Sequence, residues 1–491
     1  MNRRDFIKSA SLGAAAMALP LDAQSPAPAR RPNIIYILAD DLGMGEVGCY
    51  GQKKIRTPNI DRLAAEGMRF TAHYAGSPVC APSRCALLTG LHTGHAYIRD
   101  NDEMGFRGDV WKDLSLEGQR PLEAGTTTIG TILQQAGYRT AAIGKWGLGG
   151  PGSTGEPNRM GFDHFYGYLC QRVAHNHYPS YLWRNREKVM LDNEYVYPHE
   201  KLPAGADPND VKSYARYIGK QYSGDLMADE ALGFIRENRA RPFFLYLAFT
   251  APHAALQVPE DSLAEYLGQF PVTPYTGAKD YLPHRAPRAA YAAMVTRIDK
   301  HVGRVMSLLK ELQLDDNTIV MFSSDNGPTF NGGTDSAFFE SAAGLRGLKQ
   351  DVYEGGIRVP LVARWPGHVP MGQTSAHPSA FWDMMPTFAD LAGAKAPRET
   401  DGVSLVPSLL GKPAGQQSRE YLYWEFEGHQ AVRMTQWKAV RLKTAKATEL
   451  FDLSVDPGEK TDVSAGHPDI VKRAEAIFVI GRVESALFPL K

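Results

Sequence analysis

The chain has 491 residues, of which 43% are hydrophobic and 22% are charged, a composition typical of soluble globular proteins. This length suffices for one large domain with a smaller one, or for about two to three domains of average size. Basic and acidic residues number 54 each, and this balance argues against nucleic acid or an acidic membrane surface as the partner. We expect a small or local partner.

The first 23 residues have the pattern of an export signal. Arg3 and Arg4 precede a weakly apolar run rich in alanine and glycine, which ends near Ala23. A basic amphipathic start or a membrane anchor are the alternatives, but the apolar run is too short to span a bilayer. The paired arginines favour a twin-arginine signal over residues 1–23, and hence a periplasmic or secreted protein without a membrane span.

Four short apolar runs are predicted to be buried strands, and polar residues stand at the end of each. The runs and their polar ends are 33–39 with Asp40 and Asp41, a run ending at Lys145, 243–249 with His253, and 318–322 with Asp325 and Asn326. Helical patterns separate the runs, over residues 59–70, 128–137, 223–238 and 289–312. This alternation predicts an α/β fold whose mainly parallel sheet is covered on both faces. Ligands bind beyond the carboxyl ends of such strands, where these polar residues converge.

The last part of the chain has a different pattern. A Gly/Pro-containing link over 399–415 precedes strand-like segments at 420–428, 430–443 and 449–453 and a helical stretch over 467–483. We expect a small antiparallel sheet with a packed helix. The predicted domains are therefore a main domain over 31–400 and a C-terminal α+β subdomain over 401–491.

The stretch SPVCAPSRCALLTG, residues 77–90, has two interpretations. In the simpler one it is a helix start, because Pro82 is tolerated in a first turn. In the other, Cys80 lies at the positive end of the helix with Arg84 one turn on along the same face, which makes a seat for an anion beside a potential nucleophile. The four cysteines of the chain have neither the number of a disulfide framework nor the spacing of a zinc site.

The strand-end residues also have a structural and a functional interpretation. Asp40, Asp41, Asp325 and Asn326 are typical of caps and turns, but as hard oxygen ligands at two strand ends they predict a Ca²⁺ or Mg²⁺ site. Lys145 and Lys349 are either solvated surface charges or, with Arg84, cations that neutralise an anionic substrate. His253 is either a hydrogen-bonded structural residue or a general acid.

CAPSRCALLTG has the form Cys-x-Pro-Ser-Arg followed by Leu-Thr-Gly, and it resembles the signature of the type I, formylglycine-dependent sulfatases of the alkaline-phosphatase-like superfamily. Other stretches along the chain occur in the family's order: ILADDLG, TPNIDRLAAEGMRF, GKWGLG, SSDNG, LRGLKQDVYEGGIRVP and DGVSLVP. The resemblance implies an α/β/α sandwich with a small C-terminal sheet, which agrees with the pattern of strands and helices.

The resemblance also implies a mechanism. A maturation enzyme that reads Pro82 and Arg84 would oxidise Cys80 to formylglycine, whose hydrated aldehyde attacks sulfur and later expels sulfate. One Ca²⁺ would lie at Cys80, and the cations would hold the sulfate while His253 or Lys349 protonates the departing alcohol. The implied residues are Asp40, Asp41, Cys80, Asp325 and Asn326 for the metal, and Cys80, Arg84, Lys145, His253 and Lys349 for catalysis.

The chain departs from the family pattern at Gly147, where the family has a histidine that is the expected base for regenerating the aldehyde. The candidates for its replacement are His92, His95, His175 and His177.

Residues 91–101 and 169–185 combine the side chains that suit a sugar, which has hydroxyls at its rim and an apolar face. We expect a sulfated carbohydrate rather than an aryl sulfate. The hypothetical substrate contacts are Arg99, Arg172, His175, His177 and Trp183. The competing hypotheses are a phosphate or phosphonate monoester hydrolase, and a non-catalytic glycan-binding relative.

Overall fold

The computed structural model describes residues 31–102, 117, 119–443, 445 and 447–490. The predicted export signal over residues 1–23 lies outside this range. Residues Pro32–Lys491 form one compact unit, and the boundary predicted near residue 400 stays a prediction. No helix within the described part of the chain is long and apolar enough to cross a membrane.

An eleven-stranded sheet forms the centre of the main part, in the order β10-β2-β9-β8-β1-β7-β3-β4-β5-β6, with β11 paired to β2. The central strands β8, β1, β7, β3 and β4 run parallel to one another, whereas β9, β5 and β6 pair antiparallel with their neighbours. The mainly parallel α/β sheet is therefore confirmed. The bounds are β1 Asn33–Ala39, β2 Met68–Tyr74, β3 Arg139–Lys145, β4 His164–Tyr168, β5 Tyr181–Arg184, β6 Glu187–Met190, β7 Phe243–Ala248, β8 Thr318–Ser324, β9 Arg358–Arg364, β10 Gln373–Ser375 and β11 Ser379–Ala380.

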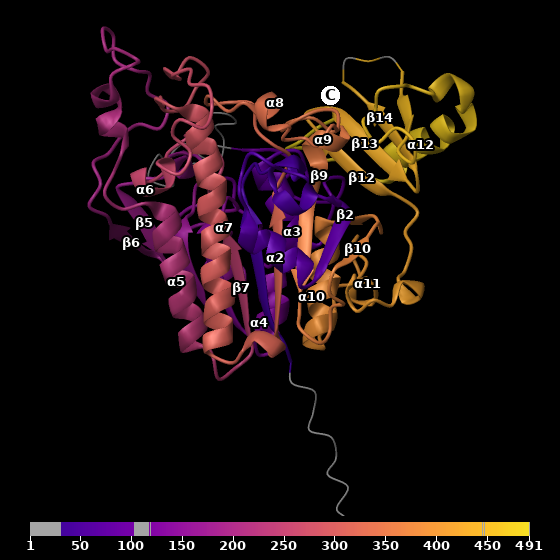
Figure 1. Ribbon diagram of the computed structural model, residues 1–491. Helices are drawn as coiled ribbons and strands as arrows, with labels where there is room; N and C mark the ends of the chain where they lie inside the picture. Colours follow the sequence, from indigo (N-terminus) through magenta and orange to yellow (C-terminus); the bar gives the residue numbers. More distant parts are fainter. Residues whose placement is uncertain (1–30, 103–116, 118, 444, 446, 491) are drawn as a thin grey trace, which may run out of the picture. The chain divides into compact units, whose positions relative to one another are not determined.

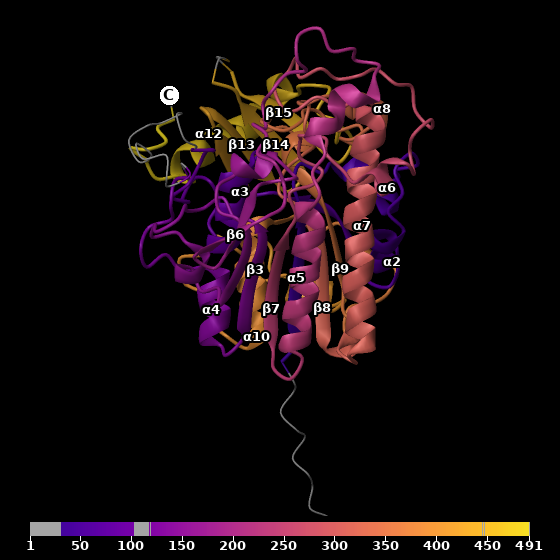
Figure 2. The same ribbon diagram turned by 90° about the vertical axis from the view of Figure 1, so that its left-hand side faces the viewer.

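Helices cover both faces of this sheet because its strands alternate their apolar side chains between two cores. In β1, Ile35 and Ile37 point into a core with α2, α5 and α7, whereas Tyr36 and Leu38 point into a core with α3, α4 and α10. Figures 1 and 2 show α5 and α7 lying alongside each other over the first face. The bounds of the helices are α2 Pro58–Ala65, α3 Cys80–Thr89, α4 Ile129–Gln135, α5 Ser223–Glu237, α6 Glu260–Leu263, α7 Pro287–Glu311, α8 Ser336–Phe339, α9 Glu354–Ile357, α10 Met384–Ala392 and α11 Val406–Leu409.

The C-terminal part forms a second, four-stranded antiparallel sheet, as the sequence predicts. Its strands are β12 Leu422–Phe426, β13 His429–Met434, β14 Trp437–Arg441 and β15 Glu449–Asp452, and helix α12 Pro468–Ile480 packs on it. The sheet, yellow in Figure 1, contacts the main part through Trp424, whose indole nitrogen donates a hydrogen bond to the carbonyl of Ala75 at 2.9 Å.

Candidate active site

Two neighbouring parallel strands bring four oxygen-bearing side chains together. Asp40 and Asp41 follow β1, Asp325 and Asn326 follow β8, and the two strands end in register. The Asp325 carboxylate accepts the backbone N–H of Asp41 at 3.0 Å, and the Asn326 amide donates to the Asp41 carboxylate at 2.7 Å. All four side chains are fully buried. The convergence predicted from the strand ends is therefore present in the fold.

Helix α3 places Cys80, its first residue, at this same edge. The thiol is 1% exposed, and its Sγ lies 3.5 Å from Asp40 Oδ1 and 3.6 Å from Lys349 Nζ. Burial, reinforced by the charge of Asp40, raises the pKa of the Cys80 thiol far above its ordinary value. An unmodified Cys80 is thus a protonated thiol at neutral pH, not an activated thiolate.

Arg84, one turn further along α3, is fully buried and joins the ends of three strands. Its Nε and Nη2 donate to Asp325 Oδ2 at 3.0 and 2.8 Å, Nη2 also reaches Asp40 at 3.2 Å, and Nη1 donates to the carbonyl of Lys145 at 2.5 Å. Burial and the charge of Asp40 raise the pKa of Asp325 to about 6, with Arg84 opposing this shift. The forked guanidinium therefore fixes the positions of these carboxylates relative to one another.

Two lysines complete a balanced set of charges. Lys145 Nζ lies 2.7 Å from Asp40, and Lys349 Nζ lies 2.8 Å from Asp41. Burial alone would raise the pKa of the Asp40 carboxyl, but Lys145 and the neighbouring cations hold it below its usual range. Similarly, Asp41 outweighs burial and keeps the pKa of Lys349 well above its ordinary value. Both lysines therefore stay charged, and neither is the solvated surface charge of the simpler interpretation. We call the following residues the strand-end cluster: Asp40, Asp41, Cys80, Arg84, Lys145, Asp325, Asn326 and Lys349.

The strand-end cluster fits a hard divalent cation. Asp40, Asp41, Cys80 and His253 each offer a ligand atom within 4.8 Å of the others. The side-chain oxygen of Asn326 is buried and has no hydrogen-bond partner within the described part of the chain. A buried amide oxygen without a donor is costly, and a cation is one group that would satisfy it. The three carboxylates and this amide oxygen suit Ca²⁺ or Mg²⁺, whereas the thiol of Cys80 and the imidazole of His253 are ligands that zinc also takes.

A group of histidines lies next to the cluster, in contact through His253. His253 Nε2 lies 3.6 Å from Asp41, while its Nδ1 contacts the carbonyl of Ala254. Burial and the nearby lysines hold the pKa of His253 well below its ordinary value. His175 stacks on the His253 ring at 4.8 Å between centroids, and its Nδ1 lies 3.1 Å from Nε2 of His199.

His177 supports this arrangement from the backbone side, because its Nε2 lies 2.9 Å from the carbonyl of His253. His199 could not be predicted as a site residue, because nothing in its loop distinguishes it from a surface histidine.

The structure does not bring His92 and His95 to this site. They follow the C-terminal end of α3, a helix about 15 Å long whose other end holds Cys80. His95 Nδ1 lies 2.8 Å from Asp401, and His92 Nε2 lies 3.6 Å from it. His92 Nδ1 accepts the N–H of Gly94, so Nε2 carries the proton of the neutral ring and faces the carboxylate. This tautomer suits a hydrogen-bonded group and not a metal site.

A glutamine occupies the space beside Gly147. The glycine has φ +76°, and a Cβ there would lie 2.8 Å from Cγ of Gln171. The Gln171 amide is buried and donates to Asn101 Oδ1 at 3.2 Å, which also accepts the N–H of Ala81 at 2.9 Å. Gln171 therefore connects to the residue that follows Cys80. No motif in the sequence distinguishes this glutamine.

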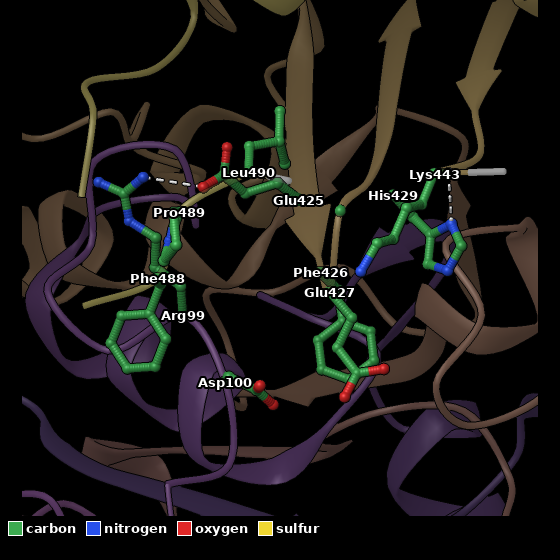
Figure 3. A pocket seen from close by; sticks show the side chains of 11 residues that line it. Arg99, Asp100, Glu425, Phe426, Glu427, His429, Lys443, Phe488, Pro489 and Leu490 are labelled. Atoms are coloured by element: carbon green, nitrogen blue, oxygen red, sulfur yellow. Dashed lines mark hydrogen bonds and ion pairs between the residues drawn. The ribbon is translucent and has the colours of Figure 1, made fainter. Parts of the chain in front are cut away.

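The remaining predicted substrate residues lie in different surroundings. Arg99 donates to Glu425 at 2.8 Å and lines a cavity of about 530 Å³ between its own loop and the C-terminal sheet. Figure 3 shows its guanidinium directed at Glu425. The indole nitrogen of Trp183 donates to Glu117 at 3.2 Å. Arg172 lies 3.5 Å from the hydroxyl of Tyr197 at the edge of another cavity. Their roles toward a substrate stay predictions.

The chain is similar to known proteins over most of its length. The model of the sulfatase family matches residues 32–394, and that of the C-terminal part of N-sulphoglucosamine sulphohydrolase matches residues 348–474. The N-acetylgalactosamine-6-sulfatase of Canis lupus familiaris is 31% identical over 501 residues, covering 99% of this chain and 84% of that protein. The N-acetylgalactosamine-6-O-sulfatase of Bacteroides thetaiotaomicron is 30% identical over 503 residues, covering 90% of this chain and 91% of its own length.

Among solved structures, that of Ps i-CgsB in complex with k-i-k-neocarrahexaose superposes with a TM-score of 0.73 and 29% identity, covering 91% of this chain and 92% of the other. These similarities extend over most of the chain and include the strand ends and the segment around Cys80. The chain belongs to the sulfatase family.

Proposed function

We propose that this sulfatase removes sulfate from a sulfated carbohydrate, using a formylglycine made from Cys80 and one Ca²⁺. The observation that carries the proposal is the position of Cys80, a buried and protonated thiol held between a carboxylate and an ammonium group. Such a thiol is a poor nucleophile, but the same position serves a hydroxyl nucleophile well. Two relatives, 31% and 30% identical to this chain, are N-acetylgalactosamine 6-sulfatases, which supports a sugar as the carrier of the sulfate.

The carboxylates of Asp40, Asp41 and Asp325 and the side-chain oxygen of Asn326, which has no hydrogen-bond partner among the described residues, would hold the cation. The hydrated formylglycine supplies a hydroxyl nucleophile for sulfur, and bound Ca²⁺ supplies positive charge for the sulfate oxygens. Arg84 keeps two of the carboxylates fixed, so the ligands need little rearrangement when the cation binds.

Lys145 and Lys349 are the groups of the chain that would bind the sulfate oxygens. Both are charged and buried, and charges preorganised in a site that excludes water stabilise developing negative charge strongly. Lys349 Nζ already carries a proton near Cys80, so we assign it the protonation of the leaving alcohol. His253 is neutral at rest, and its Nε2 would accept a proton before it could donate one.

Mass spectrometry of the tryptic peptide over residues 70–84 tests the modification. We expect an aldehyde in place of the Cys80 thiol when the protein is produced together with a formylglycine-generating maturation enzyme. A thiol that stays intact under those conditions would contradict the proposal.

Turnover of matched esters tests the reaction and the substrate class. The modified protein is assayed with a 6-sulfated amino sugar, an aryl sulfate, and the phosphate analogue of the same sugar. We expect the sulfated sugar to be cleaved with the highest kcat/KM. A preference for the phosphate analogue would favour a phosphate monoester hydrolase, and binding without turnover would favour a glycan-binding protein.

We also propose export through the twin-arginine pathway to the periplasm or beyond, because Arg3 and Arg4 precede an apolar run. Cell fractionation of a variant with both arginines replaced by lysine should find the protein retained inside the cell.

A further inference from the structure

A second cavity, of about 320 Å³, is lined by residues that adjoin His175 and His199. We call it the tyrosine cavity, because Tyr181, Tyr195 and Tyr197 line it together with Arg172, Val173 and Asn176. Tyr195 is 72% exposed and Tyr197 is 43% exposed. Two large aromatic rings left in solvent around a concave site are typical of a surface that binds a ligand. The volume equals that of roughly ten liquid water molecules, which is room for a sugar ring.

The tyrosine cavity is joined to the strand-end cluster by a single short turn. The 3-10 helix Val173–His175 contributes Val173 to the cavity wall, while its last residue, His175, stacks on His253. A second connection runs through the ring of Tyr197, which lies 5.5 Å from that of His199. The cavity therefore adjoins the histidines that lie between it and the strand-end cluster.

Hydrogen bonds connect the segments that form the walls of the cavity. The Asn176 amide is buried and donates to the carbonyl of Val196 at 3.1 Å, which ties the two tyrosines of that segment to the 3-10 turn. The N–H of Leu191 donates to the carbonyl of Ser180 at 2.9 Å. The hydroxyl of Tyr181 donates to Glu117. A cavity held by such bonds loses little conformational entropy on binding.

We propose that the tyrosine cavity is a subsite for the sugar ring linked to the sulfated sugar. Aromatic faces pack against the C–H face of a pyranose, and the Arg172 guanidinium and Ser180 at the rim offer polar groups to its hydroxyls. The subsite rests on the proposed action on a sulfated carbohydrate. It makes this sulfatase an enzyme that prefers oligosaccharides over free sulfated monosaccharides.

Paired substrates test the subsite. The probes are N-acetylgalactosamine 6-sulfate and a trisaccharide that ends in the same sulfated sugar, with an aryl sulfate as reference. We expect the wild type to cleave the trisaccharide with the higher kcat/KM. Tyr195→Ala and Tyr197→Ala should each lower this value about twofold to tenfold through KM, and leave the monosaccharide unchanged within about twofold. Phenylalanine at either position should retain most of the preference, because the ring is what stacks.

The control variant is Met371→Ala, which removes a side chain that is 67% exposed and does not line the cavity. Thermal unfolding of each variant checks that the fold is kept. If the wild type cleaves both saccharides and the alanine variants match it on the trisaccharide, the subsite is refuted while the proposed function stands. An equal loss on both saccharides also refutes it. If the wild type cleaves only the aryl sulfate, the proposed substrate class fails and the subsite fails with it.

Discussion

Lys438 on β14 is the centre of a buried charge group that joins the C-terminal sheet to the main part of the protein. Its Nζ lies 3.0 Å from Glu354, on α9, and 3.3 Å from Glu459, and all three side chains are fully buried. Glu354 has two further partners, Tyr74 and Arg358, and Glu459 Oε2 accepts the N–H of Glu354. Replacing Lys438 by methionine keeps the length of the side chain but leaves two carboxylates without this cation.

Removing one partner from a buried ion pair costs about 3–5 kcal/mol, because the remaining charge stays buried without compensation. Burial already raises the pKa of Glu459 to about 7 with Lys438 present. The loss of Lys438 should therefore destabilise the ionised form of this carboxyl further. Unfolding entropy for a unit spanning residues 32–491 is about 1 kcal/mol/K, so Lys438→Met should lower Tm by about 3–5 °C. Scanning calorimetry at pH 9 measures this shift, because at pH 7 a Glu459 carboxyl with a pKa of about 7 would take up a proton and avoid most of the cost.

The double variant Lys438→Met with Glu459→Gln is the matched test of the cause. A neutral amide tolerates the missing cation, and Glu354 keeps Arg358, so the double variant should regain most of the lost stability. If the two substitutions instead add their separate costs, the charge of Glu459 is not the source of the loss, and the reasoning is refuted.

Three further changes test other parts of the structure. Cys80→Ala should abolish sulfate release, and retained turnover would exclude Cys80 as the source of the nucleophile. The same variant should lower the free energy of unfolding, measured by denaturant titration, by only about 1 kcal/mol. Gly147→His should cost about 1–3 kcal/mol in the same titration, because φ is +76° and a Cβ meets Gln171 at 2.8 Å. A variant as stable as the wild type would contradict both sources of strain. Although burial opposes it, His301, whose Nε2 lies 3.1 Å away, and the two donors of Arg297 hold the pKa of Asp225 at about 2, against 3.8 for an ordinary aspartate. Asp225→Asn should therefore cost about 1–2 kcal/mol at pH 7, allowing for screening at this partly exposed side chain, and the difference should vanish as the pH falls from 3.8 to about 2; a gap that stays constant with pH would contradict the charge as its cause.

The sequence by itself determined the fold class and the position of the strand-end residues. Buried strands such as β1 are continuous apolar runs, and helices such as α7 have their own period, so both signals are local. Parallel strands deliver their last residues to one edge, which is why Asp40 and Asp325 could be placed together from two separate stretches. The small C-terminal sheet could also be predicted, because its strands are short local runs separated by turns.

Only the tertiary structure decided which side chains act on one another. Arg84 contacts Asp325 across 241 positions of the sequence, and no local pattern indicates that its guanidinium is engaged by carboxylates. Arg99 and Glu425 likewise form a buried pair between distant segments. Gln171 was missed because the space that it fills beside Gly147 exists only after folding. Local periodicity follows from the backbone geometry of each segment, whereas such contacts depend on how segments pack, which short-range patterns do not contain.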